Sequence, residues 1–162
     1  MKKKLSVYTI IYENISGYSL IELLVVIGIL SIIVSIIFPN FMAARQRSRD
    51  TQRKSDLIQI QKSMELFKMD QTNPAYPSPS AFPAALCNDC WSSGANCTGN
   101  IYMKKFSCDP AGFAPTPYYY DRTDTLNYDL VACLENPADP DKDLTPNPIC
   151  TITNSSYTVN EP

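Results

Sequence analysis

The sequence predicts an α+β fold, in which a long N-terminal α-helix packs on a small antiparallel β-sheet head. Three observations lead to this fold class. Residues 18–38 are almost entirely apolar, residues 41–69 contain neither glycine nor proline, and twelve of the thirteen prolines follow residue 73. Helical periodicity ends where the prolines begin, and short β-like runs follow. Helix and strands therefore come from separate parts of the chain, as in α+β proteins.

Residues 1–17 are predicted to be a leader peptide that is removed from the mature protein. The leader starts with Lys2–Lys4 and ends at Gly17, directly before the apolar run. An ordinary secretory signal is cut after its apolar core, at small residues. Here the cut would lie before the apolar run, so we expect the run to stay in the mature chain as an anchor.

Residues 18–38 are predicted to form a transmembrane helix that also serves assembly. At ~1.5 Å per residue this segment measures roughly 30 Å, which matches the hydrocarbon thickness of a bilayer. Lys2–Lys4 would hold the N-terminus in the cytoplasm. Five basic residues between 45 and 54 oppose this orientation under the positive-inside rule, but long domains cross membranes largely regardless of their charge.

Glu22 is the only acidic or basic side chain between residues 18 and 38. A carboxylate inside an apolar segment is costly unless it meets a partner, so it points to a functional role. Cleavage after Gly17 would create a free α-amine on Tyr18, close to this acid. A plain single-pass anchor accounts for the apolar run, but it gives no reason for Glu22 or for the glycine before the run.

Residues 39–72 are predicted to continue the same helix, because strong helix formers occupy most positions. Pro39 is expected to kink or end the helix locally. One apolar stripe repeats at steps of three and four residues, and we expect it to pack on the sheet: Leu57, Ile60, Met64 and Phe67. Residues 45–56 hold no large apolar side chain, so they are not expected to bury a face in the head.

Residues 73–162 are predicted to form a small globular β head. Residues 73–83 carry four prolines and are expected to be an irregular connection, and the cysteine-rich segment 87–100 is expected to be a loop. The second and third of five β-like runs should pair as a hairpin. The five runs are Ile101–Phe106, Pro117–Asp121, Tyr128–Leu134, Ile149–Thr153 and Tyr157–Val159.

All six cysteines lie in the head: Cys87, Cys90, Cys97, Cys108, Cys133 and Cys150. An even number in an exported domain favours disulfides in an oxidising compartment. Among the pairings we favour Cys133 with Cys150, and the other four cysteines cannot be assigned. The alternative for those four is a zinc site, although only Cys87 and Cys90 have ligand spacing and the chain has no histidine.

The residues from Gly17 and Tyr18 through Glu22 to Ile27 resemble the cleavage and assembly motif of type IV pilins and type II secretion pseudopilins. The likeness continues through Pro39, which matches the helix-kinking proline of this family, and through Arg49–Leu57, which resembles the major pseudopilins. The family usually has phenylalanine where this chain has Tyr18. The resemblance implies a pilin fold for the chain.

The resemblance also implies how the chain is processed and what it builds. A membrane prepilin peptidase would cut between Gly17 and Tyr18, and the new Tyr18 amine would be methylated. The chain would then be a structural subunit that polymerises through its N-terminal helix into a helical filament on a membrane assembly machine. In this filament, the Tyr18 ammonium of an incoming subunit would meet the Glu22 carboxylate of a neighbour, so that two poorly solvated charges neutralise each other.

The expected location follows from the same resemblance. The subunit would sit in the cytoplasmic membrane before assembly, and afterwards in a periplasmic pseudopilus or a cell-surface pilus. A DNA-uptake pilus subunit is one alternative, and a membrane-anchored binding domain that never polymerises is another. We expect no enzyme, because the chain has no histidine, no apparent nucleophile–base pairing and no phosphate-binding glycine loop.

The basic stretch 45–54 leaves three interpretations open. It is a solvated helix face with an Asp50–Lys54 pair, a source of salt bridges between subunits, or a contact for DNA or anionic headgroups. Because the head is acidic, direct binding of nucleic acid by the head is not expected. No cofactor other than calcium is expected.

Calcium is considered because major pseudopilins bind it in a late acidic loop. Asp139, Asp141 and Asp143 are the candidate ligands in this chain. The segment is not an EF-hand, since it lacks the glycine at the sixth position and has Cys150 in place of the bidentate glutamate. A solvated loop without metal is the alternative.

Overall fold

The computed structural model describes residues 17–83, 86–111 and 118–162. The expected leader before Gly17 and the first residue of the second expected strand, Pro117, lie outside these ranges. The chain divides into two compact units, with the boundary between Pro39 and Asn40. The elements are, in chain order, α1 (Leu20–Asp70), β1 (Trp91–Ser92), the 3₁₀ helix η1 (Ala95–Cys97), β2 (Ile101–Met103), β3 (Tyr119–Asp121), β4 (Asp129–Cys133) and β5 (Ser156–Asn160).

The first unit contributes the apolar part of α1. Every side chain described from Gly17 to Pro39 is exposed in the single chain. Among the described residues, α1 is the one helix whose length and composition suffice to cross a membrane. Pro39 lies inside α1, so the helix does not end there as one of the expected alternatives required.

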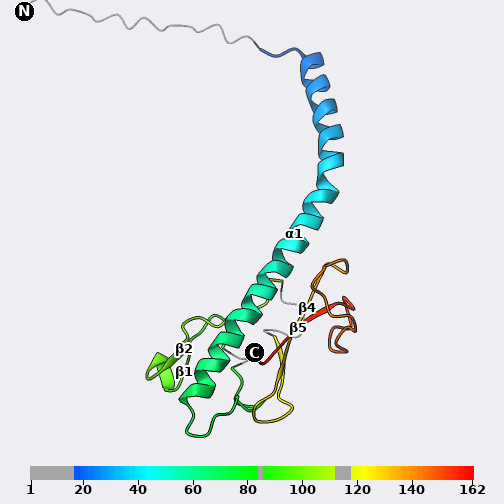
Figure 1. Ribbon diagram of the computed structural model, residues 1–162. Helices are drawn as coiled ribbons and strands as arrows, with labels where there is room; N and C mark the ends of the chain where they lie inside the picture. Colours follow the sequence, from blue (N-terminus) through cyan, green and yellow to red (C-terminus); the bar gives the residue numbers. More distant parts are fainter. Residues whose placement is uncertain (1–16, 84–85, 112–117) are drawn as a thin grey trace, which may run out of the picture. The chain divides into compact units, whose positions relative to one another are not determined.

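The second unit is built around the C-terminal part of α1. The expected stripe is confirmed, because Leu57, Ile60 and Met64 are fully buried and Phe67 packs against the same core. The three-stranded antiparallel sheet has the order β3-β4-β5, and it lies beside this part of the helix (Figure 1). The expected hairpin is present as β3 paired with β4, with Tyr120 opposite Leu130.

The central strand β4 is buried on both faces of this sheet. Leu130 and Ala132 point into the core that contains the helix stripe, whereas Val131 and Cys133 form a second cluster with Cys150. This alternation follows from the period of two along a strand. The helix therefore covers one face of β4, and the loop that carries Cys150 covers the other.

Three predictions about the head were wrong. The segment 87–100 contains β1, which pairs with β2, and the short helix η1. The expected strand Ile149–Thr153 is a series of turns, because Cys150 makes local backbone hydrogen bonds to Asn147 and Asn154 instead of pairing with a strand. The third prediction concerns residues 45–56, which do bury a face: Asp50 and Arg53 are 0% exposed.

Candidate functional site

The N-terminal end of the described chain is an exposed segment in front of α1. Gly17, Tyr18 and Ser19 lie outside regular secondary structure, and the Tyr18 side chain is 91% exposed. A Cβ atom added at Gly17 would meet nothing within 4 Å. No described residue therefore imposes a need for glycine at this position by packing against it.

Glu22 has a local partner at the start of the helix. The Ser19 backbone N–H donates a hydrogen bond of 2.8 Å to Glu22 Oε2, and the Leu23 N–H donates to the Ser19 carbonyl at 3.2 Å. This is half of a capping box, in which the third residue of a helix accepts from the N-cap backbone. The Ser-x-x-Glu spacing is a known signal for this cap, and the sequence analysis missed it.

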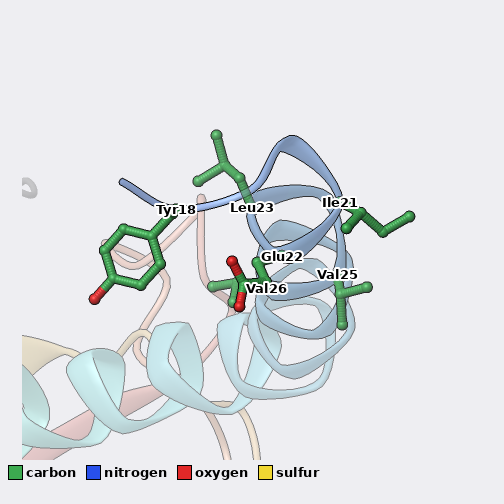
Figure 2. Close-up of a pocket in the computed structure, with 6 residues that line it drawn as sticks. All are labelled: Tyr18, Ile21, Glu22, Leu23, Val25 and Val26. Carbon is green, nitrogen blue, oxygen red and sulfur yellow. The ribbon is translucent and has the colours of Figure 1, made fainter. Parts of the chain in front are cut away.

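The surroundings of Glu22 are apolar and open. A shallow depression beside it is lined by the side chains of Tyr18, Ile21, Leu23, Val25 and Val26 (Figure 2). Figure 2 shows the Tyr18 ring directed away from the helix, whereas Ile21 and Val25 project from one side of it. Such a surface offers apolar contact area around one carboxylate, which suits an apolar partner that carries a positive charge.

A second polar cluster lies where α1 meets the head, and sequence reasoning did not find it. Arg53 is fully buried and donates to three carboxylates, at 2.7 Å to Asp50, 2.6 Å to Asp109 and 2.8 Å to Glu135. Burial disfavours the guanidinium, but these acids outweigh it and raise the pKa of Arg53. The cluster joins the helix to two separate segments of the head.

Asp50 and Arg49 fasten the same head segment to the helix. Asp50 accepts hydrogen bonds from the backbone N–H groups of Glu135 at 2.9 Å and Asn136 at 2.8 Å. The Nε and Nη2 atoms of Arg49 each donate a hydrogen bond to the Glu135 carboxylate, and the bond from Nε measures 2.7 Å. These backbone bonds hold the chain just after β4 against α1.

Lys54 extends this attachment to the acidic loop. Its ammonium lies 3.0 Å from Asp139 and 2.7 Å from Asp141. One of the three interpretations included an Asp50–Lys54 pair, and this pair is wrong, since both residues have other partners within the chain. Arg45 and Arg47, by contrast, are exposed. Asp143, the third candidate calcium ligand, instead accepts hydrogen bonds from the backbone and hydroxyl of Thr158 and from the Ser156 hydroxyl.

Metal binding would have to compete with these contacts. Within the described part of the chain, no group of three or more His, Cys, Asp or Glu side chains is arranged to hold a metal. Calcium at Asp139, Asp141 and Asp143 stays a prediction, and calcium there would have to displace the Lys54 ammonium.

The cysteines form three disulfides in the head. Cys133 pairs with Cys150, which is the pair that the sequence analysis favoured. The pairs that it left open are Cys87–Cys108 and Cys90–Cys97. Zinc ligation by these four cysteines is not supported, because each sulfur is bonded to another sulfur.

The attachment of the head to the helix is expected to weaken in acid. The hydrogen bond from Arg49, and to a smaller extent the one from Arg53, holds the pKa of Glu135 below its ordinary value of 4.5. Burial acts to raise the pKa of Asp139, but the Asp141 backbone N–H and Lys54 lower it overall. A carboxyl group whose pKa is lower in the folded than in the unfolded protein stabilises the fold at pH values above its unfolded-state pKa. This stabilisation is lost as the pH falls through its folded-state pKa. Asp56 acts in the opposite direction, because burial raises its pKa.

We therefore expect the urea midpoint to be lower at pH 3.5 than at pH 7. Fluorescence of the single tryptophan, Trp91, which is buried in the core, reports unfolding of the head. Glu135→Gln should lower the midpoint at pH 7 and should lose less on acidification than the original protein. An acid response identical in Glu135→Gln and in the original protein would contradict the role given to Glu135.

Comparison with known proteins finds one matching family model and several similar proteins. Residues 14–38 match the family described as "Prokaryotic N-terminal methylation motif". A "Type II secretion system core protein G" of Pseudomonas aeruginosa is 33% identical over 107 residues, which cover 65% of this chain and 72% of that protein.

For two further relatives, the matched region covers a smaller share of the relative's own length. The "Type IV wide pilus major component PilA4" of Thermus thermophilus is 38% identical over 55% of this chain and 65% of that protein. A "Type II secretion system core protein G" of Aeromonas hydrophila is 33% identical over 45% of this chain and 50% of that protein. No solved structure matches the chain.

Proposed function

Because this chain belongs to the family of type II secretion pseudopilins and type IV pilins, we propose that mature subunits begin at Tyr18 and polymerise through their N-terminal helices. The chain is a structural subunit of this family, and its methylation motif indicates processing by a prepilin peptidase. The observation that carries the proposal is the placement of Glu22 within an exposed apolar helix, directly after an exposed cleavage segment.

Gly17 supports cleavage between residues 17 and 18. Its surroundings among the described residues leave room for a side chain, so packing does not account for a requirement for glycine here. A protease that must approach the backbone closely supplies such a requirement. Tyr18 and Ser19 are free of regular structure, which leaves the peptide bond accessible.

The charge pair proposed for assembly joins two copies of the chain. The Tyr18 α-ammonium of an incoming subunit approaches the Glu22 carboxylate of its neighbour, while the apolar segments pack and exclude water. A charge pair in such surroundings is favourable only if both charges are present. The Ser19 N–H remains bonded to one oxygen of Glu22, so the carboxylate is oriented before the amine arrives.

The partners and the location follow from this mechanism. Before assembly the subunit spans the cytoplasmic membrane once, with its leader in the cytoplasm, where a prepilin peptidase acts on it. The assembly machinery then transfers it from the bilayer into a periplasmic pseudopilus or a surface pilus. The exposed apolar surface of residues 20–38 is covered by lipid in the first state and by neighbouring subunits in the second.

Processing is tested by expressing the chain with and without a prepilin peptidase. With the peptidase, mass spectrometry should find a protein that begins with N-methylated Tyr18. Gly17→Val should retain the leader, because the side chain obstructs the approach of the protease. Gly28→Val is the matched control, since that glycine also has nothing within 4 Å in its own chain. Normal cleavage of Gly17→Val, or an intact Met1 in the original protein with peptidase present, would contradict the proposal.

A further inference from the structure

We propose that Arg45 and Arg47 bind the headgroups of anionic phospholipids at the outer face of the cytoplasmic membrane while the subunit awaits assembly. This inference rests on the proposed function, because it concerns the state in which the subunit spans the bilayer. It chooses among the three interpretations left open for the basic stretch 45–54, and it is independent of the Tyr18–Glu22 pair.

The structure divides the basic stretch into two groups. Arg49, Arg53 and Lys54 are bound to carboxylates of their own chain, so most of their charge is compensated inside the subunit. Arg45 and Arg47 are exposed, and within the described part of the chain neither forms an ion pair with an acid. Two positive charges of the stretch are therefore available to a partner outside the subunit.

These two arginines follow the apolar segment closely. Arg45 and Arg47 come seven and nine residues after Phe38, where the apolar run ends. At ~1.5 Å per helical residue, this corresponds to roughly 10 and 14 Å along the helix. The headgroup layer is about 5–8 Å thick on each side of the hydrocarbon. Helical side chains lean toward the N-terminus of their helix, so both long side chains lean back toward this layer.

The residues between the apolar run and the arginines have an intermediate character. Residues 40–48 are all exposed, and they include the large side chains of Phe41 and Met42. The Arg45 guanidinium lies over the Phe41 ring, 5.9 Å from its centre, so a ring and a cation share one side of the helix. An aromatic ring followed by a cation matches the change from hydrocarbon to headgroup at a membrane surface.

The placement of the two arginines around α1 favours lipid over a macromolecular partner. Residues two positions apart in a helix are separated by about 200° around the axis and by only ~3 Å along it, so Arg45 and Arg47 point to different sides at nearly the same height. Headgroups surround a spanning helix on every side at one depth, so both cations can reach an anionic lipid. A DNA duplex or a second subunit that approaches from one side would contact only one of them.

Native mass spectrometry of the processed full chain in nanodiscs tests this contact. The bilayer contains phosphatidylcholine and phosphatidylglycerol in equal amounts, and the lipids that stay bound to the protein are identified by mass. We expect phosphatidylglycerol to be retained in preference, with one molecule for each arginine. Arg45→Gln and Arg47→Gln should each lose one of these lipids, with an affinity about fivefold lower at that site, and the double variant should retain neither.

Lys62→Gln is the matched control for the single variants. Lys62 is an exposed cation on the same helix, but it lies about 25 Å farther along α1 than Arg45, so its loss should leave the retained lipids unchanged. Arg45→Lys combined with Arg47→Lys should keep the preference for phosphatidylglycerol, because a cation is retained at both positions. Unchanged urea midpoints by Trp91 fluorescence would show that all these variants are folded.

Three results would overturn the inference alone. These are equal retention of both lipids by the original chain, loss of both anionic lipids in one single variant, and the same loss in Lys62→Gln as in the arginine variants. Duplex DNA that binds the chain in phosphatidylcholine nanodiscs and not the double variant, without any preference for phosphatidylglycerol, would assign the arginines to nucleic acid instead. A chain that does not enter the bilayer, or that still begins at Met1 after exposure to prepilin peptidase, would contradict the proposed function itself.

Discussion

Glu22→Gln is expected to abolish filament formation almost as completely as Glu22→Ala, while both variants are still inserted and cleaved. Removal of one partner of a buried charge pair typically costs ~3–5 kcal/mol, which lowers the equilibrium constant for subunit addition by a factor of roughly 100 or more. The measurement is the mass of sheared filaments relative to processed subunit in the membrane.

The two variants separate the helix cap that Glu22 makes from the charge pair proposed for it. Glutamine can still accept the hydrogen bond from the Ser19 N–H, so it retains the helix cap but cannot neutralise an amine. Alanine removes both functions. Ser35→Ala, a polar change in the same apolar segment, should assemble normally. If Glu22→Gln formed filaments as the original chain does, the cap would be the required feature and the charge pair would be refuted.

Arg53→Met is expected to destabilise the head by ~3–5 kcal/mol, because it leaves Asp50, Asp109 and Glu135 buried or nearly buried without their shared cation. For a domain of this size, the thermal midpoint should fall by more than about 10 °C. Urea or thermal unfolding of the processed protein in detergent, followed by Trp91 fluorescence, measures this loss.

Arg47→Met is the matched control for Arg53→Met. Arg47 lies on the same helix but is exposed, so its replacement should change stability by no more than about 0.5 kcal/mol. Arg53→Lys should give an intermediate loss, since lysine keeps the charge but cannot span three carboxylates with a rigid fork. Equal midpoints for Arg53→Met and Arg47→Met would show that the cluster does not stabilise the head.

The elements whose signals are local could be predicted from the sequence. The helix was expected to start at Tyr18 and starts at Leu20, and its stripe from Leu57 to Phe67 packs as expected. The hairpin of β3 and β4 and the strand β5 also lie where the β-like runs predicted them. In each case apolar spacing within the segment carries the information.

The errors arose where one segment depends on distant partners. Ile149–Thr153 has β-like composition, but it forms no ladder with any described strand, and Cys150 is instead bonded to Cys133 of β4. Residues 45–56 contain no large apolar side chain, so the pattern of apolar residues alone predicted that they are exposed to solvent. Their burial is polar, and it is compensated by charges from other parts of the chain.

The sequence by itself determined the apolar anchor, the motif around Gly17 and Glu22, and the helix that follows, because each depends on residues within a few positions of one another. Only the tertiary structure decided what the basic stretch does. Arg53 meets Asp109 and Glu135 across 56 and 82 residues, and Lys54 meets Asp139 across 85. A charge in the sequence attracts any opposite charge, so the fold alone selects which acids come close enough to bind it.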